Sequence, residues 1–479
     1  MSLAKLANVS PFSPQVTRFV ESGSPLDVEA QRRGTSTYLV ERRLDMLPVL
    51  LTADLCSLRG GVDRLAFSAL MELTPEGDVV KADFAKTVIR SRAALTYHEA
   101  QVFIDDAQGA KDDGDVPRAV RYLAKLGRAL RRKRVAAGAL SLASPEVRFM
   151  LSNESDSPTD VGAYQLVEAN STVEEFMLLA NVQVAAFLLR KYPALTVLRH
   201  HPSPPPDRFD GLKAMLGSRG LALDVATSKA LADSLDAAQD PEDPYLNKLV
   251  RILTTRCMAP AKYFCSNDKD EPDYVHYGLA AKVYTHFTSP IRRYADVVAH
   301  RLLAAAIGFA PLPRALAESG AKQALTAVCA NLNRRNKNAQ LASRHSIALY
   351  TRLFFKDRPQ SRVAARVLAV AKNKVDVLVP RYGIEGSLYL APKGADDAAL
   401  DAAVAHDEER HALAWTHPET GRDARVAVFD AVLVDIYVAA PQSAAEDVGT
   451  IRIDLVDPPP PALDAAAVPP PKKKKQRQA

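Results

Sequence analysis

Short apolar segments separated by turn residues mark the first 115 residues of the chain. Residues 64–73 form one strand-like segment, residues 79–89 form a second that is rich in β-branched residues, and Thr-Pro-Glu-Gly lies between them. Two such segments around a turn sequence favour a β-hairpin. We therefore predict strands and turns over this first part.

Helical periodicity replaces this pattern from about residue 118. Within residues 118–135, Val120, Leu123, Leu126 and Leu130 recur on one side, and basic residues occupy the others. This is the pattern of an amphipathic helix with a basic exposed surface. Further helices are predicted over residues 172–192, 212–238, 245–255, 289–307 and 321–353.

Strands return after residue 359. Five β-branched segments occupy residues 363–370, 375–379, 387–390, 425–438 and 449–456. Five strands in so short a stretch are typical of a small OB-type barrel. The predicted fold class is therefore α+β: a mixed α/β domain followed by a five-stranded OB-fold β-barrel. Tyr382, Arg381, Lys372 and Lys374 offer stacking and charge suited to single-stranded nucleic acid, while the same loops could instead dock a protein.

Positive charge is concentrated at the end of the chain. The 479 residues carry a net charge of +6, but the last eight hold five basic and no acidic residues, so the other 471 carry +1. The charge of the body is therefore no sign of nucleic-acid binding. The tail, within residues 458–479, is expected to be disordered, and its lysines have the make-up of a nuclear localisation signal. We expect a location in the nucleus, including the nucleolus, with a cytoplasmic pool allowed.

Composition excludes several classes of protein. With 47% hydrophobic and 25% charged residues, the chain is typical of a soluble globular protein of two to four domains. Its four cysteines form no Cys-x-x-Cys pair, which argues against a disulfide scaffold or a structural zinc site. No apolar run reaches the ~18 residues of a membrane span. We expect reduced thiols and no membrane partner.

The segment with the clearest chemistry lies at residues 286–303. Ser289 is a good N-cap, Pro290 suits a first helical position, and apolar residues repeat at helical spacing from Ile291 onwards. A helix start offers free N–H groups to an anion, and Arg292 and Arg293 would add guanidinium groups that bind phosphate. This predicts a phosphate site. The alternative is a surface cap whose arginines face water or pair with Asp296.

The same segment carries a family resemblance. His-Phe-Thr-Ser-Pro-Ile-Arg-Arg-Tyr-Ala-Asp at residues 286–296, followed by His-Arg-Leu-Leu, resembles the signature of the RNase II (RNB) family of exoribonucleases. Further stretches, at residues 62–68, 144–148, 173–181, 198–202 and 382–386, resemble the branch that forms the catalytic subunit of the eukaryotic RNA exosome. The resemblance covers roughly residues 16–458.

This resemblance implies a domain organisation and an activity. It implies an RNB exoribonuclease domain at 1–308, a helical extension at 309–358, an OB-fold RNA-binding domain of the ribosomal-protein S1 type at 359–457 and a basic tail. The implied reaction is 3′-to-5′ hydrolysis of RNA to nucleoside monophosphates, used in rRNA processing and RNA decay. The implied partners are single-stranded RNA and the exosome core complex.

Site residues also follow from the resemblance. Arg292 would clamp the scissile phosphate, and Tyr97 and Glu174 would position the 3′-terminal nucleotide, the carboxylate by bonding ribose hydroxyls. Glu175 is the neighbouring candidate. The other expected RNA-binding residues are Thr288, Ser289, Arg293, Asn181 and Arg199.

Each of these roles has a plainer alternative. Glu174 could be the capping-box partner of Ser171, and Tyr97 could be an ordinary half-buried aromatic residue. His286 and His300 are expected to be packed rather than to bind a metal. The basic surface of residues 121–134 is expected to be a solvated face rather than a wall that follows RNA.

The metal ligands of the family are the main departure. The family holds a Mg²⁺ pair with an Asp-rich loop of the pattern Asp-Ile-Asp-Asp-Ala-Leu, whereas residues 1–26 contain no aspartate. Asp105 and Asp106 imitate the motif in Phe-Ile-Asp-Asp-Ala but are expected to be surface carboxylates. We therefore expect no metal ligands in this sequence. Either it is a truncated form of an active exonuclease, which we favour, or it is an inactive paralogue that holds RNA 3′ ends.

Overall fold

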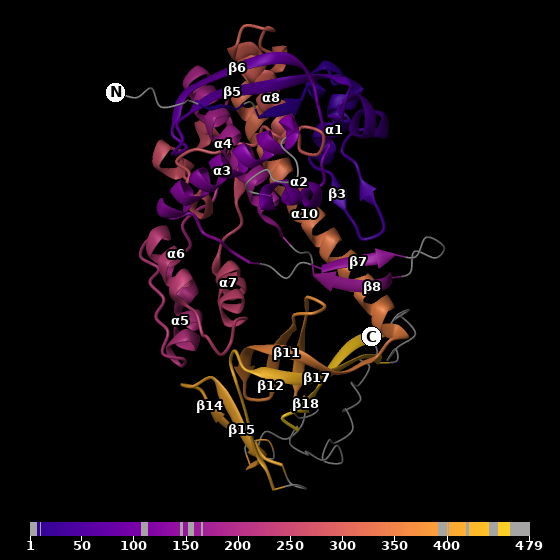
Figure 1. Cartoon of the computed structure of the whole chain (residues 1–479), viewed down its shortest axis with the longest axis vertical. Coiled ribbons are helices and arrows are strands. Elements are labelled where there is room, and N and C mark those ends of the chain that lie inside the picture. Colours follow the sequence, from indigo (N-terminus) through magenta and orange to yellow (C-terminus); the bar gives the residue numbers. More distant parts are fainter. Residues whose placement is uncertain are drawn as a thin grey trace, which may run out of the picture.

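The computed structural model describes residues 7–9, 11–106, 114–143, 147–151, 158–163, 166–390, 400, 402–417, 421–439 and 449–459. Figure 1 shows a body of sheet and helices at one end and a β-barrel at the other. The long helix α10 (Ala321–Lys356) runs from the first to the second. Helices and strands followed by a barrel confirm the predicted α+β class.

A hairpin forms the outer layer of the first body. Its strands β5 (Asp63–Leu73) and β6 (Val79–Arg90) pair antiparallel, and Gly77 N donates to Thr74 O across the turn at 2.9 Å. Strands β1 (Ala7–Val9) and β2 (Phe12–Pro14) pair with the other edge of β5. The predicted hairpin is confirmed, and its Phe67 and Met71 are buried in the core.

Helices pack beneath this sheet (Figure 1). Helix α4 (Glu168–Lys191) contacts α3 (Asp115–Ala136) and α8 (Tyr294–Ala306). Within the described residues, α4 is the one helix long and apolar enough to span a membrane. Its Phe176 and Val184 are buried in the core beside the sheet, so its packing is that of a core helix.

The helices differ from the prediction in three places. Helices α1 (Pro25–Arg33) and α2 (Tyr97–Asp105) lie in the part predicted to be strands and turns. Helix α1 starts at the N-cap Ser24, and α2 starts at a capping box formed by Thr96 and Glu99. Neither capping signal was used in the prediction from sequence. The predicted helix at 212–238 is two helices, α5 (Asp210–Gly217) and α6 (Ser228–Ala237), because the chain reverses at Gly220 with φ +70°.

The remaining elements of this body are short or connect it to the barrel. They are β3 (Thr37–Tyr38), β4 (Arg43–Leu44), β7 (Val147–Leu151), β8 (Pro158–Ala163), β9 (Val197–His200), β10 (Lys262–Cys265), α7 (Leu246–Cys257) and α9 (Arg314–Ala317).

A buried polar cluster joins α1 to α8. Asp27 accepts hydrogen bonds from Arg301 at 2.7 Å and from the Tyr294 hydroxyl at 2.8 Å, and Arg301 also donates to Val20 O. Buried ion pairs of this kind are kept only when their remaining donors and acceptors are satisfied. The cluster fixes the position of α8, and therefore of the turn that precedes it.

The barrel contains the predicted five-stranded sheet, in the order β13-β12-β11-β17-β18. Its strands are β11 (Gln360–Ala371), β12 (Lys374–Val379), β13 (Ile384–Tyr389), β17 (Ala431–Ala439) and β18 (Thr450–Asp457). The single strand predicted at 425–438 is wrong, because the chain turns at Phe429, where φ is +71°. The residues before this turn belong to a separate sheet of β14 (Ala405–Asp407), β15 (Ala412–Thr416) and β16 (Asp423–Ala427).

The barrel also corrects one expected nucleic-acid contact. Tyr382 is buried, its hydroxyl donates to Gln360, and its ring packs against Phe354 and Phe355 of α10. A ring enclosed in this way cannot stack on a base. The expectation for Tyr382 is therefore wrong, whereas Tyr389 on β13 is 57% exposed.

Helices α5 to α7 attach the barrel to the first body. Val428 and Phe429 of the barrel are buried in the same apolar cluster as Leu216 and Leu249. Arg219 pairs with Asp430, and elsewhere along this contact Arg366 pairs with Asp243 and Arg256 with Glu385. The two bodies are thus joined by α10 on one side and by this apolar contact on the other.

Candidate functional site

The turn before α8 differs from its prediction. The helix begins at Tyr294 with Arg293 as N-cap, not at Ser289. Ser36 N donates to Arg292 O and Tyr294 N donates to Gly34 O, so residues 292–294 pair with an extended segment instead of continuing a helix. Ser289 N donates to Asp296 Oδ1 at 2.7 Å, which closes the turn. The predicted N-cap role of Ser289 is wrong.

The two arginines of this turn have separate environments. Arg293 donates twice to buried Asp296, at 2.8 Å each, and to Thr288 Oγ1 at 3.4 Å. Arg292 is exposed, and among the described residues no carboxylate lies within ion-pair distance of it; its guanidinium donates only to Ser289 Oγ at 3.3 Å. Arg293 can therefore hold the turn, while Arg292 is free to bind an anion.

A hollow of about 240 Å³ lies beside Arg292. Thr288 and Ser289 line it together with Tyr38 of β3 and Arg43 of β4. Tyr38 is 47% exposed, and Arg43 is paired with Asp45 at 2.5 Å. An exposed aromatic ring beside a free guanidinium suits one nucleotide, since the ring can stack on a base and the cation can bind its phosphate.

Sequence reasoning did not assign Tyr38 or Arg43 to this hollow. They come from a short hairpin some 250 positions earlier in the chain, which reaches the turn through the bridge between Thr35 and Arg293. No local pattern signals that contact. The structure does bring together three of the predicted residues, Thr288, Ser289 and Arg292.

Helix α4 carries two adjacent carboxylates with opposite exposure. Glu175 is 3% exposed and accepts hydrogen bonds from Arg134 of α3 at 2.6 to 3.2 Å. Glu174 is 53% exposed and lies 3.7 Å from the same arginine. Helix α4 starts at Glu168, so the capping box proposed for Glu174 with Ser171 is wrong. Of the two carboxylates, Glu174 is the one available to a ligand.

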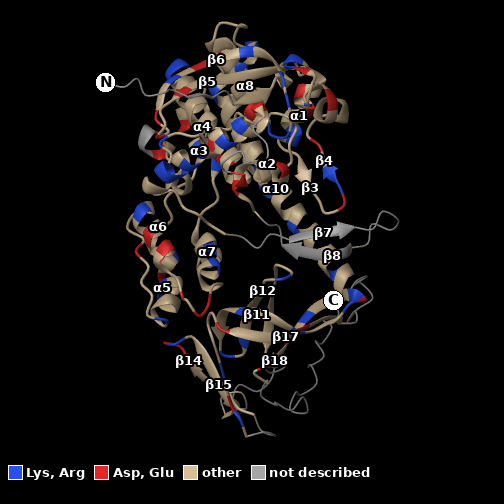
Figure 2. Ribbon diagram, in the orientation of Figure 1, with Lys and Arg blue, Asp and Glu red and all other residues tan. Residues whose placement is uncertain are grey.

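The basic surface of α3 also needs a correction. Figure 2 shows lysines and arginines along this helix. Lys125 and Arg132 are exposed as expected, but Arg134 turns inward to Glu175. Although burial opposes it, pairing with Glu175 raises the pKa of Arg134 above its ordinary value. Arg134 therefore belongs to the support of α4 and not to a solvated face. Asp106 is likewise no free surface carboxylate, because its side chain is only 12% exposed.

Asn181 joins α4 to the segment that leads into the turn. Its amide donates to the Tyr284 hydroxyl at 3.0 Å and accepts from Phe287 N at 2.8 Å, and the side chain is buried. These bonds use the amide for internal support. A direct contact between Asn181 and RNA stays a prediction, and the burial of the side chain argues against it.

Arg199 and His286 both contact Tyr263. The Arg199 guanidinium is 4.7 Å from the centre of the Tyr263 ring, and the Tyr263 hydroxyl is 2.6 Å from His286 Nδ1. Burial lowers the pKa of His286 well below its ordinary value, helped by nearby arginines. The imidazole is therefore neutral and packed. The predicted RNA contact of Arg199 stays a prediction.

Tyr97 is the first residue of α2 and is 41% exposed. Helix α2 packs against α3 and α4, so Tyr97 stands on the same group of helices as Glu174. The described structure records no contact between Tyr97 and the turn of Arg292. Its role at the 3′-terminal nucleotide stays a prediction.

His300 gives a testable pH dependence. It is fully buried between Phe67 and Phe287, and burial lowers its pKa to about 4. The unfolded chain therefore binds this proton more readily, so the free energy of unfolding falls as the pH drops from about 6.5 to 4, by about 3 kcal/mol. Urea unfolding at both pH values measures the fall.

A His300→Gln variant keeps a donor for Phe287 O but removes the titration. We expect its stability to fall about 3 kcal/mol less over the same pH range, and exposed His98→Gln to behave like the parent. An unchanged fall in His300→Gln would show that this imidazole is not the titrating group.

Carboxylates near the hollow do not fit a pair of divalent cations. Among the described residues no group of three or more His, Cys, Asp or Glu side chains lies at ligand geometry. Asp45, which lines the hollow, is paired with Arg43. Hard divalent cations need several anionic oxygens. The described residues that line the hollow therefore suit a phosphate group better than a pair of metal ions.

Comparison with known proteins adds two family matches. Residues 14–308 match the model of the RNB domain, and residues 361–448 match that of an S1 domain. Exosome complex exonuclease RRP44 homolog A of Arabidopsis thaliana is 50% identical over 398 residues, which cover 83% of this chain and 42% of that protein. Exosome complex exonuclease RRP44 of Homo sapiens is 44% identical over 443 residues, which cover 92% and 44%. The chain thus spans about two fifths of the length of these curated relatives.

Two solved structures share the fold. The apo form of Mycoplasma genitalium RNase R superimposes with a TM-score of 0.77 at 20% identity, covering 94% of this chain and 67% of that one. Yeast Ssd1, a pseudonuclease, gives a TM-score of 0.76 at 15% identity, covering 96% and 65%. At such identities the likeness concerns the fold alone.

Proposed function

The chain belongs to the RNB-domain family, whose members are 3′-to-5′ exoribonucleases, and from that premise we propose that it holds the 3′ end of single-stranded RNA at Arg292. The resemblance found in the sequence is thereby confirmed at the level of the family. Binding, substrate and partners are proposals, because the chain spans about two fifths of its curated relatives.

The free Arg292 guanidinium carries this proposal. It faces a hollow with one exposed aromatic ring, and the pair of fully buried Asp296 with Arg293, whose side chain is 17% exposed, holds the turn on which it stands. A guanidinium binds phosphate through two parallel hydrogen bonds. The arrangement supports binding of the terminal phosphodiester, with Tyr38 available to the base.

Glu174 and Tyr97 would act on the terminal ribose and base. Glu174 is exposed at the start of α4, and its neighbour Glu175 is neutralised by Arg134. A carboxylate that accepts from a 2′-hydroxyl distinguishes RNA from DNA. We therefore propose that Glu174 supplies the preference for RNA.

A Glu174→Gln variant tests this role. A hydrogen bond to a charged group contributes about 1.5–3 kcal/mol, so we expect the ratio of RNA to DNA affinity to fall roughly tenfold or more. Fluorescence anisotropy with matched RNA and DNA strands measures the ratio. Glu168→Gln makes the same charge change on the same helix and should leave the ratio of RNA to DNA affinity unaltered. Equal ratios for the two variants would refute the role of Glu174 in preferring RNA.

Hydrolysis is a separate question from binding. The family resemblance implies Mg²⁺ held by an aspartate cluster, and no such cluster lies among the described residues. We propose that these residues bind RNA ends without cleaving them. This holds both for a segment of an active exonuclease and for an inactive RNA-binding paralogue.

Assembly and location are two further parts of the proposal. The names of the curated relatives place them in the exosome complex, so we propose the exosome core as a partner of this chain. The basic tail supports a nuclear location with a cytoplasmic pool.

The test uses residues 1–479 and a 5′-labelled single-stranded RNA in Mg²⁺. We expect a gel shift and an RNA of unchanged length. A ladder of 3′-shortened products that EDTA abolishes would contradict binding without cleavage, and the absence of any shift would contradict the proposed function.

A further inference from the structure

Lys86 occupies a position where a strand normally carries an apolar side chain. It follows Ala82 and Phe84 on the face of β6 that packs on the core, since every second residue of a strand shares a face. Its partner across the hairpin is Phe67, which is fully buried. The structure therefore places an amine at the margin of the apolar core.

Two aromatic rings flank this amine. Lys86 Nζ lies 3.9 Å from the centre of the Phe309 ring and 4.9 Å from the centre of the Phe67 ring. Phe309 follows the end of α8 and is 61% exposed, whereas Phe67 is not exposed at all. Because Lys86 is only partly buried, a small reagent can still reach its amine.

No acidic partner balances the charge of Lys86 within the part of the chain that the structure describes. Burial lowers the pKa of the amine to about 8, and the cation of Arg18 lowers it further in the same direction. His300, the other titratable group beside it, has a pKa of about 4 and is neutral at pH 7. Ring faces attract an ammonium ion but do not replace its hydrogen bonds to water.

The neutral amine is therefore well populated under ordinary conditions. With a pKa of about 8, about a fifth of the Lys86 side chains are neutral at pH 7.4, against about one in a thousand for an ordinary lysine. The neutral amine is the nucleophilic form, and an apolar site beside a second cation is how proteins activate lysine.

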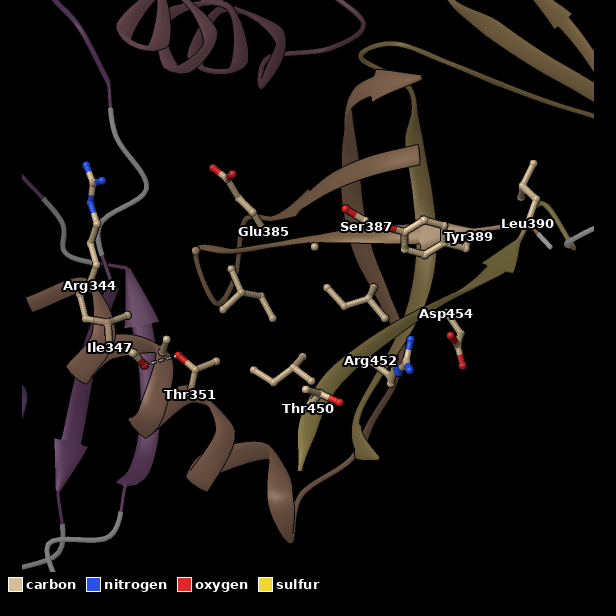
Figure 3. A pocket seen from close by; sticks show the side chains of 16 residues that line it. Arg344, Ile347, Thr351, Glu385, Ser387, Tyr389, Leu390, Thr450, Arg452 and Asp454 are labelled. Carbon is tan, nitrogen blue, oxygen red and sulfur yellow. Dashed lines mark hydrogen bonds between the residues drawn. The ribbon is translucent and has the colours of Figure 1, made fainter. Parts of the chain in front are cut away.

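Arginine side chains offer no such group. Arg344 and Arg452, which line a cleft of about 1210 Å³ in the barrel (Figure 3), carry guanidinium groups that are not deprotonated in proteins. They can hold an anion but cannot attack a carbonyl carbon. Lys86 can do so, and the proposed function makes no use of it.

We propose that Lys86 is a modification site, at which the amine takes an acyl group from an acyl thioester. The amine nitrogen attacks the thioester carbonyl, a C–N bond forms and the C–S bond breaks. The sulfur leaves as a thiolate and takes up the proton that the nitrogen loses. The products are an amide on Lys86 and a free thiol, so no oxidant or reductant is needed.

The surroundings of Lys86 favour an acyl group over other small electrophiles. An amide is uncharged, and its N–H can point to a ring face. A carbamate formed with carbon dioxide would instead place an anion over the negative faces of two rings. The uncharged amide also removes the repulsion between Lys86 and Arg18.

The test uses the full chain and acetyl-CoA at pH 7.4. After partial reaction the protein is unfolded and its remaining amines are saturated with an isotopically heavy acetyl group, so that peptide mass spectrometry gives the extent of reaction at each lysine. Two lysines are internal controls: exposed Lys125 on α3, and Lys81 of the same strand, which pairs with Asp83 at 2.6 Å.

We expect Lys86 to react about tenfold faster than either control, because its neutral form is far more populated. The rate at Lys86 should level off above about pH 8, whereas an amine with the ordinary pKa still gains reactivity there. In urea, where the fold is lost, the three lysines should react alike.

Arg18→Gln tests the surroundings of the amine without disturbing the core, since Arg18 is exposed. We expect acetylation of Lys86 at pH 7.4 to become about threefold slower, because the amine loses a neighbouring cation. Arg32→Gln removes another exposed arginine and should leave the rate unchanged. Equal rates for the two variants would contradict the contribution of Arg18.

Acetylation of Lys86 no faster than that of Lys125 in the folded chain would overturn the inference. A preference for Lys86 that persists in urea would overturn it too, because the preference would then come from the local sequence and not from the fold. Neither outcome bears on RNA binding, since Lys86 does not line the Arg292 hollow.

Discussion

Replacing Arg292 by glutamine is expected to weaken binding of a single-stranded RNA 3′ end about 10- to 150-fold, because hydrogen bonds to a charged group contribute about 1.5–3 kcal/mol. Arg292 is exposed and donates only to Ser289 within the chain, so the variant should fold normally. Arg292→Lys keeps the charge but loses the planar guanidinium, so its affinity for RNA should lie between that of the parent and that of Arg292→Gln.

Anisotropy titration with a labelled RNA measures this effect. Arg32→Gln removes another exposed arginine, on α1, and serves as the control. Equal affinities for the parent and Arg292→Gln would remove Arg292 from the site, whatever the remainder of the chain does with RNA.

Replacing Asp296 by asparagine is expected to lower the free energy of unfolding by about 3 kcal/mol, since it leaves the largely buried Arg293 guanidinium uncompensated. Asp296 is fully buried and accepts from Arg293 twice and from Ser289 N once. The turn would lose its support, so RNA affinity should fall together with stability. Urea unfolding measures the first effect.

A double variant separates charge from packing. Arg293→Met with Asp296→Asn removes both charges, and replacing a buried pair by apolar or neutral groups is often nearly neutral. We expect the double variant to be more stable than Asp296→Asn alone. A single variant within 1 kcal/mol of the parent, or a double variant less stable than the single, would contradict a paired and buried Arg293.

Local patterns predicted those parts of the fold that depend on neighbours in sequence. The hairpin of β5 and β6 and the amphipathic helix α3 followed from alternation, a turn sequence and helical spacing. The start of α8 did not, because the backbone of Arg292 and Tyr294 pairs with residues 34–36. A bond across more than 250 positions has no trace in a window of a few residues.

Burial decided which of the predicted side chains can meet a ligand. Glu174 and Glu175 are neighbours in sequence, but Glu175 is buried and hydrogen-bonded to Arg134, whereas Glu174 is 53% exposed. Tyr382 and Tyr389 both lie in the barrel, yet one is enclosed by α10 and the other is exposed. Arg292 was predicted from its motif. Tyr38, which lines the same hollow, could be assigned to the site only from the fold.

The central claim is that the chain holds a free RNA 3′ end at Arg292, and a competition between linear and circular RNA of one sequence tests it most directly. Only the linear strand has an end to place in the hollow. We predict that the parent binds linear RNA more tightly and that Arg292→Gln abolishes this preference. Equal affinity of the parent for the linear and circular strands would contradict the claim.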